Sequence, residues 1–477
     1  MLFNSLQFIL FFLIVTPVYY LLPHKFRWFH LLASSCVFYM AFVPVYILIL
    51  FGTIIIDYFA GLLIAKAIGR KRKYYLIISL IANIGVLFVF KYYNFFIDNI
   101  NEAGGANLPF LKILLPIGLS FHTFQAMSYT IEVYRGNQKA EKHFGIYALY
   151  VMFYPQLVAG PIERPQNILH QFHEKKQFSY ANIVNGMKMI AWGMFKKVVV
   201  ADRLAVYVNE VFDHQLNYEG IPVIIACIFF SLQIYFDFSA YSDIAIGTAK
   251  TLGFDLMINF KMPYFSRSIT EFWSRWHISL STWFRDYLYI PLGGNRISKA
   301  RTKINQFIVF IISGFWHGAN WTFIFWGFLH GTFIVIENEL KKLVGTFKLY
   351  LPLKRILIFG LITVAWIFFR ADNIKQAFKI IGSLENNVFS QLSNIISNTD
   401  LARLKLLYAN KGSGVFLLSL LFVSGVMLIE WKQKERSIVQ YFHSLSKPVR
   451  YSMYFFLIYG SIFFGIFEKN QFIYFQF

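Results

Sequence analysis

The chain has 477 residues, of which 57% are hydrophobic and only 14% are charged, and it contains 56 Phe and 29 Tyr. Such a composition is too apolar to be hidden in one soluble core, so lipid must act as a second solvent and a soluble enzyme with a single anchor is excluded. The formal net charge of +21 comes from Lys and Arg clustered between apolar runs, which membrane topology explains more economically than a nucleic-acid partner.

Apolar segments that approach the roughly 20 residues needed to cross a bilayer recur along the whole chain. The first, 3–22, is interpreted as a mature span because no small-residue cleavage site follows it. The spans predicted in the first part of the chain are 3–22, 28–42, 45–65, 74–96, 113–133 and 146–159. The later ones are 187–200, 221–251, 304–314, 321–336, 356–369, 415–431 and 451–467.

Two segments, 187–200 and 273–292, mix aromatic and basic residues, so we expect them to be re-entrant or interfacial. Loops 66–73, 341–355 and 432–450 are rich in Lys and Arg and are therefore predicted to be cytoplasmic. Alternation from these loops places both termini outside.

No repeat of fixed period, Gly/Ser linker or low-complexity tract divides the sequence, so a single membrane domain over residues 1–477 is expected. The stretch 373–412 is predicted to form a small external cap with a short helix near 374–384. Cys36 and Cys227 lie within apolar runs without metal or redox spacing, which indicates a packing role. No metal site is predicted.

The first polar cluster is Ser313-Gly314-Phe315-Trp316-His317-Gly318-Ala319-Asn320, where one imidazole stands among glycines and indoles between two apolar runs. Ionisable groups in such surroundings are costly, so each is a functional-site hypothesis. A buried neutral His317 could take a proton from a hydroxyl or a thiol, although a lone histidine can also be a core residue bonded to a backbone carbonyl. His330, in Leu329-His330-Gly331, either orients substrate or bonds within the helix bundle.

The second cluster runs from Glu271 through Trp273-Ser274-Arg275-Trp276-His277 to Arg285 and Gly294. If 272–287 is one helix, the tryptophans share one face, and His277 and Arg285 lie on a polar stripe. One interpretation is an interfacial helix whose arginines meet lipid headgroups. The other is a pathway for an anionic acyl donor, with Arg275 and Arg285 at its phosphates and His277 near its thioester.

The third cluster, 233–243, places Asp237 and Asp243 in an apolar stretch. Six positions separate them on different helical faces, which disfavours a two-carboxylate glycosidase site and favours pairing with Arg275, Arg285 or Arg203. The prolines of Gly160-Pro161-Ile162-Glu163-Arg164-Pro165 predict a turn that closes an apolar run. Phosphate-binding loops, nucleophile elbows and zinc motifs are missing from the sequence.

Taken in order, Leu157-Val158-Ala159-Gly160-Pro161, 237–243, Phe272-Trp273-Ser274-Arg275-Trp276-His277 with its continuation to Gly294, and Trp316-His317-Gly318 resemble the membrane-bound O-acyltransferase (MBOAT) family. The run 283–294 and the ending 472–477 are similar to the branch of the alginate O-acetyltransferase membrane subunit. The resemblance is strongest over 108–331 and weakest over 373–410.

This resemblance implies an all-α, polytopic fold: a ring of tilted transmembrane helices with re-entrant helices around a central funnel and tunnel. It implies that His317 is catalytic at their junction and that His277 lies on the cytoplasmic approach. It further implies that acetyl-CoA is the cytoplasmic donor, with no cofactor bound. An extracytoplasmic, hydrolase-like partner protein would then acetylate an extracellular or envelope polysaccharide at a bacterial cytoplasmic (inner) membrane.

The chemistry fits this scheme, because a thioester needs only alignment, a base and a stabilised oxyanion. Backbone amides near Gly318 or the side chain of Asn320 could stabilise that oxyanion. Transfer of a D-alanyl group from a carrier protein to teichoic acid is the alternative within the family. A transporter or flippase, with buried charged residues as its ion sites, is the alternative of another class, and a structural scaffold is a third.

Overall fold

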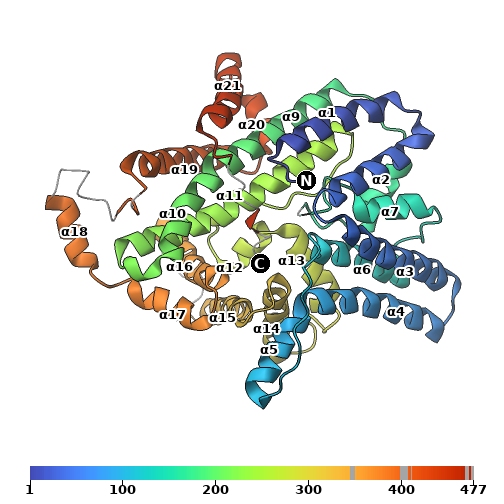
Figure 1. The fold of residues 1–477 in the computed structure, drawn as a ribbon, viewed down its shortest axis with the longest axis horizontal. Coiled ribbons are helices and arrows are strands. Elements are labelled where there is room, and N and C mark those ends of the chain that lie inside the picture. Colours follow the sequence, from blue (N-terminus) through green and yellow to red (C-terminus); the bar gives the residue numbers. More distant parts are fainter. Residues whose placement is uncertain (159, 344–349, 398–406, 410, 468–471, 474–477) are drawn as a thin grey trace. The chain divides into compact units, whose positions relative to one another are not determined.

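The computed structural model describes the whole chain except residues 159, 344–349, 398–406, 410, 468–471 and 474–477. Every regular element in the described residues is helical (Figure 1), as the sequence predicts. The chain packs as two compact units: residues Met1–Ile190 with Tyr241–Ile258 form unit 1, and residues Ala191–Ala240 with Asn259–Phe477 form unit 2. Two helices, α9 (Tyr180–Met194) and α11 (Ile221–Thr251), contribute residues to both units.

Unit 1 is built mainly from the N-terminal helices. They are α1 (Leu6–Leu21), α2 (His24–Met40), η1 (Pro44–Tyr46), α3 (Ile47–Lys66), α4 (Arg70–Leu87), η2 (Phe88–Tyr92), α5 (Tyr93–Gly104), α6 (Leu119–Arg135), α7 (Phe144–Met152) and α8 (Pro165–His173). Helices α3, α4 and α6 pack against one another. A side chain at Gly61 would collide with the ring of Tyr129, so glycine lets α3 and α6 approach closely.

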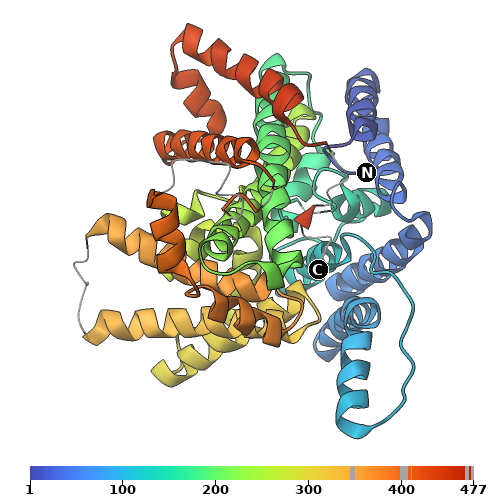
Figure 2. The same ribbon diagram turned by 60° about the vertical axis from the view of Figure 1, so that its left-hand side comes forward.

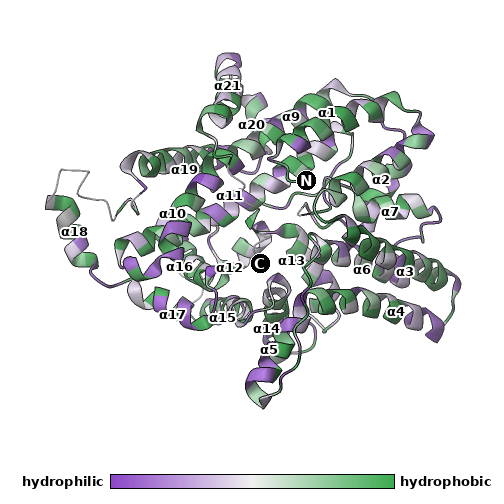
Figure 3. Ribbon diagram, viewed as in Figure 1, coloured by the Kyte–Doolittle hydropathy of each residue, from purple (hydrophilic) through white to green (hydrophobic). Residues whose placement is uncertain are grey.

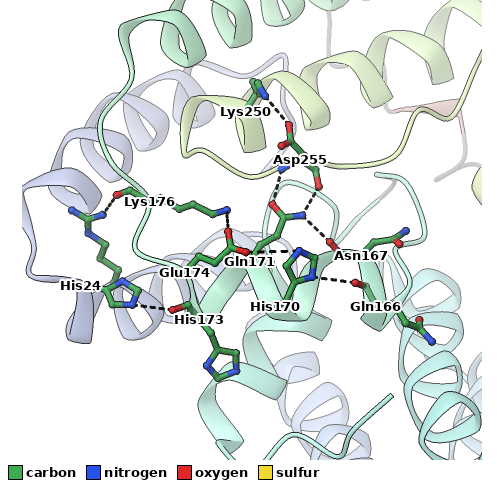
Figure 4. A network of polar contacts seen from close by, with 11 residues as sticks. His24, Gln166, Asn167, His170, Gln171, His173, Glu174, Lys176, Lys250 and Asp255 are labelled. Atoms are coloured by element: carbon green, nitrogen blue, oxygen red, sulfur yellow. Dashed lines mark hydrogen bonds and ion pairs between the residues drawn. The ribbon is translucent and has the colours of Figure 1, made fainter. Parts of the chain in front are cut away.

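A polar network joins α8 to the segment that follows α11, all within unit 1 (Figure 4). The Gln171 amide donates to the carbonyl of Asp255 at 3.0 Å and accepts from its N–H at 2.9 Å, while Lys250 pairs with the Asp255 carboxylate at 2.7 Å. The buried Glu163 carboxylate accepts from the N–H of Met257. The turn predicted around residues 160–165 therefore also positions a loop distant in sequence.

Unit 2 contains the remaining elements. They are η3 (Phe195–Ala201), α10 (Asp202–Asp213), η4 (Gln215–Asn217), η5 (Pro263–Phe265), α12 (Ile269–Arg275), α13 (Ile278–Phe284), η6 (Arg285–Tyr289), α14 (Lys299–His317), α15 (Trp321–Leu343), α16 (Leu351–Arg370), α17 (Ile374–Ser383), α18 (Val388–Ser397), α19 (Ser413–Gln433), α20 (Ile438–Ser444) and α21 (Lys447–Phe464). Helices α14 and α15 lie side by side as a hairpin (Figures 1 and 2).

Five helical segments of the described chain are long and apolar enough to cross a membrane by length and composition: Pro44–Lys66, Arg70–Gly104, Ile221–Thr251, Leu351–Arg370 and Ser413–Gln433. Apolar residues also cover most of α1 and α3 (Figure 3), and large apolar side chains remain exposed along these helices and along α21. In a soluble protein such surfaces would be unstable, whereas lipid accommodates them. The chain is thus a multi-pass membrane protein.

Several predicted boundaries differ from the structure. The predicted span 221–251 coincides with α11, and 74–96 lies within the longer α4–η2–α5 segment. By contrast, α6 begins only at Leu119, because Pro116 and the left-handed Gly118 (φ 78°) precede it. The span predicted over 146–159 is shorter, since α7 ends at Met152 before Pro155. The predicted cap contains α17 and α18, while 398–406 and 410 lie outside the described residues.

Candidate active site

His317 is the last residue of α14, and its position depends on glycines around it. A Cβ on Gly314 would lie 2.2 Å from the backbone oxygen of Phe323, and one on Gly318 would lie 2.1 Å from the Phe323 ring. A Cβ on Gly327 would likewise lie 2.2 Å from the backbone oxygen of Phe310. Only glycine fits at these three positions. Gly314 and Gly327 let the backbones of α14 and α15 come into contact, and Gly318 makes room for the Phe323 ring next to His317.

Aromatic rings enclose the buried imidazole of His317. Its ring centroid lies 4.8 Å from Trp316, 5.2 Å from Trp326 and 5.3 Å from Phe369. Only 6% of the His317 surface is exposed. The three rings fix the position of the imidazole by their shape, and they also shield it from water.

His277 occupies a bend, which corrects the prediction that 272–287 forms a single helix. Helix α12 ends at Arg275 and α13 begins at Ile278, and His277 has the left-handed conformation with φ 43° and ψ 54°. Non-glycine residues rarely adopt this conformation, and where they do the surrounding structure must hold them there. The bend destroys the shared tryptophan face that a continuous helix would have had.

Asn259 holds His277 in this bend. Its Oδ1 accepts from the N–H of Ser279 at 3.3 Å and from the Ser279 hydroxyl at 2.9 Å, and it lies 3.0 Å from Nδ1 of His277. Because the Ser279 N–H can only donate, the atom facing it is oxygen, and Nδ1 of His277 must carry a proton to bond it. Burial lowers the pKa of His277 to about 3, so the imidazole is neutral and its lone pair is on Nε2.

The three predicted histidines share aromatic neighbours. The Trp316 ring lies 4.8 Å from that of His317 and 6.5 Å from that of His277, and Trp326 lies between His317 and His330, 4.7 Å from the latter. The indole N–H of Trp273 donates to Nδ1 of His330 at 3.3 Å, so His330 takes the tautomer opposite to that of His277. Unit 2 therefore brings together residues that lie up to 53 positions apart.

Asn320 joins the end of this hairpin to the chain after α16. Its Oδ1 accepts from the N–H of Thr322 at 3.0 Å, which caps the start of α15, and its Nδ2 donates to the carbonyl of Asp372 at 2.8 Å. Both ends of the amide are thus engaged in holding the loop that carries His317.

The two arginines of the second cluster form ion pairs. Arg275 pairs with Glu271 at 2.9 Å and with Glu435 at 3.4 Å, whereas Arg285 pairs with Asp286 at 2.7 Å. Arg275 is therefore tied to the basic loop that follows α19. Arg285 is mostly exposed.

Asp237 does not pair with Arg275, Arg285 or Arg203, as the sequence suggested. Its carboxylate pairs with the buried Lys197 at 2.7 Å and accepts from the N–H of Ile473 at 2.8 Å, and the same lysine also pairs with Asp202 at 2.9 Å. The predicted pairing was wrong because η3 brings Lys197 to α11.

Two other parts of the sequence prediction are Asp243 and the C-terminal run 472–477. Asp243 belongs to the portion of α11 in unit 1, and its role stays a prediction. Of the C-terminal run 472–477, only Phe472 and Ile473 lie within the described residues.

Sequence reasoning did not identify Lys197 and Asn259 as partners of site residues. For Lys197 a signal existed, because the pair Lys196-Lys197 interrupts an apolar run and a buried cation requires a carboxylate. For Asn259 the sequence offers none, because its contact with His277 depends on a backbone bend that no local motif indicates.

Two recesses of unit 2 are lined by residues close to those around His317. The α13 cavity, of about 380 Å³, is lined by residues that include Trp273, Ser281, Arg285, Ser313 and Asn338. The α17 groove, of about 540 Å³, is lined by residues that include Gln215, Asn217, Asp372, Lys375, Gln376 and Lys379. Ser313, which lines the α13 cavity, lies one helical turn before His317. Asn320 lies three residues after His317 and donates to the carbonyl of Asp372, which lines the α17 groove. His317 is thus close in sequence and space to both recesses.

Comparison with known proteins identifies the family of the chain. The model of the MBOAT, membrane-bound O-acyltransferase family matches residues 142–372. The probable alginate O-acetylase AlgI of Pseudomonas aeruginosa is 39% identical over 402 residues, which cover 83% of this chain and 77% of the relative. The chain belongs to the membrane-bound O-acyltransferase family.

Other members of the family are also similar to this O-acyltransferase. The peptidoglycan O-acetyltransferase of Helicobacter pylori is 37% identical over 380 residues, with 74% of this chain and 72% of the relative covered. The teichoic acid D-alanyltransferase of Streptococcus thermophilus is 31% identical over 240 residues, with 46% and 56% covered. The O-acetyltransferases therefore match over most of the chain, and the D-alanyltransferase over less than half of it.

Proposed function

We propose that this O-acyltransferase takes an acetyl group from cytoplasmic acetyl-CoA and passes it to a hydroxyl on the other side of the membrane, for O-acetylation of an envelope or extracellular polysaccharide. The observation that carries the proposal is the buried His317 at the end of α14, one helical turn after Ser313 of the α13 cavity and linked through Asn320 to Asp372 of the α17 groove. Such a group can meet a donor from one recess and an acceptor from the other. A ring of tilted helices around a funnel and a tunnel is the arrangement we expect.

The α13 cavity is suited to the donor. It lies toward the end of α15 near Asn338, which leads into the basic loop predicted to be cytoplasmic, and the link between Arg275 and Glu435 joins α12 to another such loop. Arg285 lines the cavity and could meet a phosphate of the donor. The aromatic and aliphatic side chains that also line the cavity suit an uncharged thioester arm.

The reaction needs one proton relay at His317. The imidazole takes the proton of the acceptor hydroxyl while the hydroxyl oxygen attacks the thioester carbonyl carbon. The tetrahedral intermediate then collapses, the carbon–sulfur bond breaks, and the imidazolium returns the proton to the thiolate. Donors for the transient oxyanion are expected from backbone amides near Gly318 or from Asn320.

The relatives support acetyl transfer over D-alanyl transfer. The similarity to proteins named as probable alginate O-acetylases and as a peptidoglycan O-acetyltransferase covers 74% or more of the chain, whereas that to D-alanyltransferases covers about half. We further propose an extracytoplasmic hydrolase-like protein as the partner that receives the acetyl group and completes the transfer.

Replacement of His317 by Ala tests the function. Ester-linked acetate on the cell's polysaccharide should fall at least about 100-fold while the amount of protein in the membrane is unchanged, because removal of a general base costs that much. The matched control is His173→Ala, which removes an exposed histidine of unit 1 and should leave the acetate unchanged. Normal acetate in the His317→Ala strain would refute the role of His317.

The donor requires a separate experiment. Membrane vesicles that expose the cytoplasmic face should release free CoA from added acetyl-CoA labelled in the acetyl group, and they should form a labelled ester. A transporter would move a molecule without forming a new ester bond, so label recovered only as unchanged acetyl-CoA or acetate would favour that class.

A further inference from the structure

The basic surface is the stretch 432–450, which joins α19 to α21 in unit 2 and contains α20 (Figure 1). It carries five Lys and Arg residues and one acidic residue, Glu435. The carboxylate of Glu435 pairs with Arg275 of α12 at 3.4 Å, so its charge is met outside the stretch. The basic surface therefore has an excess of positive charge.

The fold holds the basic surface in a fixed shape. Phe442 of α20 is fully buried, and its ring centroid lies 6.3 Å from Trp192 and 5.7 Å from Tyr454. Arg436 closes the turn after α19, where its Nη1 donates to the hydroxyl of Ser444 at 3.0 Å. The exposed lysines around α20 thus stand on a packed support.

Two of these lysines occupy positions that their own local structure disfavours. Lys434, at the end of α19, has φ 56° and ψ −128°, a conformation that glycine adopts far more readily. Lys447 is the first residue of α21, where the helix dipole disfavours a cation, and the first turn contains no acidic residue. Lys432, Lys434 and Lys447 are exposed, and none of them forms an ion pair within the described residues. Lysine at 434 and at 447 therefore lowers the stability of the chain itself, and an anion from outside would offset that cost.

The neighbours of the basic surface indicate that the membrane supplies this anion. Helix α19 has 21 residues, and at 1.5 Å per residue this corresponds to about 30 Å, the thickness of the hydrocarbon layer. Trp431 and Tyr451 directly precede and follow the basic surface, and each is 56% exposed, as is typical of rings at the level of lipid headgroups. A segment rich in Lys and Arg directly after a span is the pattern that attracts anionic lipid. The residues 432–450 do not line the α13 cavity, which suits the donor.

We propose that the basic surface binds anionic phospholipid of the membrane, with Lys432, Lys434 and Lys447 at the headgroup phosphates. A headgroup with a net negative charge is favoured over a zwitterionic one, because the excess positive charge of the surface repels an ammonium group. The lipid supplies the anion that Lys434 and Lys447 lack within the described chain.

The lipid site is connected to the bend of His277 through the end of α19. The carboxylate of Glu430, in the last turn of α19, accepts from the hydroxyl of Tyr235 at 2.9 Å, and the Tyr235 ring lies 6.1 Å from that of Trp276. Together with the ion pair of Arg275, this contact ties the two residues before His277 to the same helix end. Lipid that fixes the end of α19 therefore supports the bend, and this consequence rests on the function proposed above.

The test uses the purified full-length chain in phosphatidylcholine vesicles that contain about one quarter brominated phosphatidylglycerol or, for comparison, brominated phosphatidylcholine. Bromine quenches tryptophan fluorescence on contact, and the share of Trp431 is the difference from Trp431→Phe. We expect stronger quenching of Trp431 by the phosphatidylglycerol. In Lys434→Gly/Lys447→Gln, the fraction of phosphatidylglycerol needed for half-maximal quenching should rise at least about fivefold, because each lysine near an anionic surface contributes about that factor.

The two substitutions are chosen so that folding is preserved. Both remove a lysine that is locally disfavoured, so the melting temperature of Lys434→Gly/Lys447→Gln in uncharged detergent should be no lower than that of the unaltered protein. The matched control Lys375→Gln/Lys379→Gln removes two exposed lysines of α17 and should leave the quenching of Trp431 unchanged. The single variant Lys447→Gln serves if the double variant is unstable.

Equal quenching of Trp431 by the two brominated lipids, or an unchanged half-maximal fraction in the lysine variant, would overturn the proposal. A higher KM for acetyl-CoA in the lysine variant, measured in phosphatidylcholine alone, would assign the surface to the donor and would also overturn it.

The link to the bend has its own readout. Release of CoA from acetyl-CoA by the unaltered protein should be several-fold faster with phosphatidylglycerol than with phosphatidylcholine alone, and the lysine variant should lose this dependence. Release that does not depend on the lipid in the unaltered protein would overturn the link. Absence of CoA release in every vesicle would contradict the proposed function, while the quenching of Trp431 would still decide whether the lipid binds.

Discussion

The surroundings of His277 and His317 hold two buried imidazoles by different means. At the His277 bend, a polar side chain fixes both the ring and its tautomer, because Asn259 bonds the imidazole and Ser279 together. At the end of α14, glycines and aromatic rings hold His317 by shape. The hydrogen bond to Asn259 sets which nitrogen of His277 carries the proton.

These different surroundings favour different roles for His277 and His317. The pKa of His277 is lowered to about 3, so its imidazole stays neutral through the physiological range and is suited to positioning neighbours. His317 lies near residues that line both recesses and is the residue that we propose as the base. Three substitution experiments test this difference between the two histidines.

The largest effect is expected from Gly318→Ala. The added Cβ would lie 2.1 Å from the Phe323 ring, so the loop and the imidazole of His317 must shift. A displacement of about 1 Å at a reacting group can lower the rate about 100-fold, which acetate formation would measure. Gly360→Ala in α16 is the matched control, because nothing lies within 4 Å of its added Cβ. The additional change Phe323→Leu should restore part of the activity, and full activity in Gly318→Ala alone would contradict placement by shape.

A moderate effect is expected from Asn259→Ala. The change leaves the imidazole of His277 and the hydroxyl of Ser279 without their shared acceptor, at a cost of about 1–3 kcal/mol in the free energy of unfolding. We expect a lower melting temperature in detergent and activity reduced about tenfold, with the pH profile of the remaining activity unchanged. A shifted pH profile would mean that His277 takes part in proton transfer, and the two histidines would then have to be assigned differently.

The smallest effect concerns pH and stability. Below about pH 6.5 the unfolded chain binds a proton at His277, whereas the folded protein binds one only near pH 3. Folded protein therefore holds fewer protons in this interval, and His277 contributes a loss of stability of about 1.4 kcal/mol per pH unit as the pH falls. Between pH 7 and pH 5 the melting temperature of His277→Gln should fall less than that of the unaltered protein. The exposed His173→Gln should leave the slope as it is, and identical slopes for all three proteins would argue against a buried neutral His277.

The sequence predicts the helical membrane fold better than it predicts the surroundings of the candidate site residues. Helix α11 begins and ends as predicted, because a long apolar run needs only its own composition to be helical. The break at His277 could not be predicted, since it depends on Asn259, which lies 18 positions earlier. Lys197 was missed as the partner of Asp237 for a related reason: ion pairs between distant helices follow from packing and not from spacing.

The α14–α15 hairpin also sets a fixed length inside the molecule. Asn320 caps α15 at the groove, and Asn338 lines the cavity 18 residues further along the same helix. One inserted residue in between would turn the far half of α15 by about 100° and carry Asn338 away from the cavity. The glycine contacts with α14 prevent the helix from sliding to compensate. The hairpin thus fixes the separation of the two recesses. Its residue types can therefore change more readily than its number of residues.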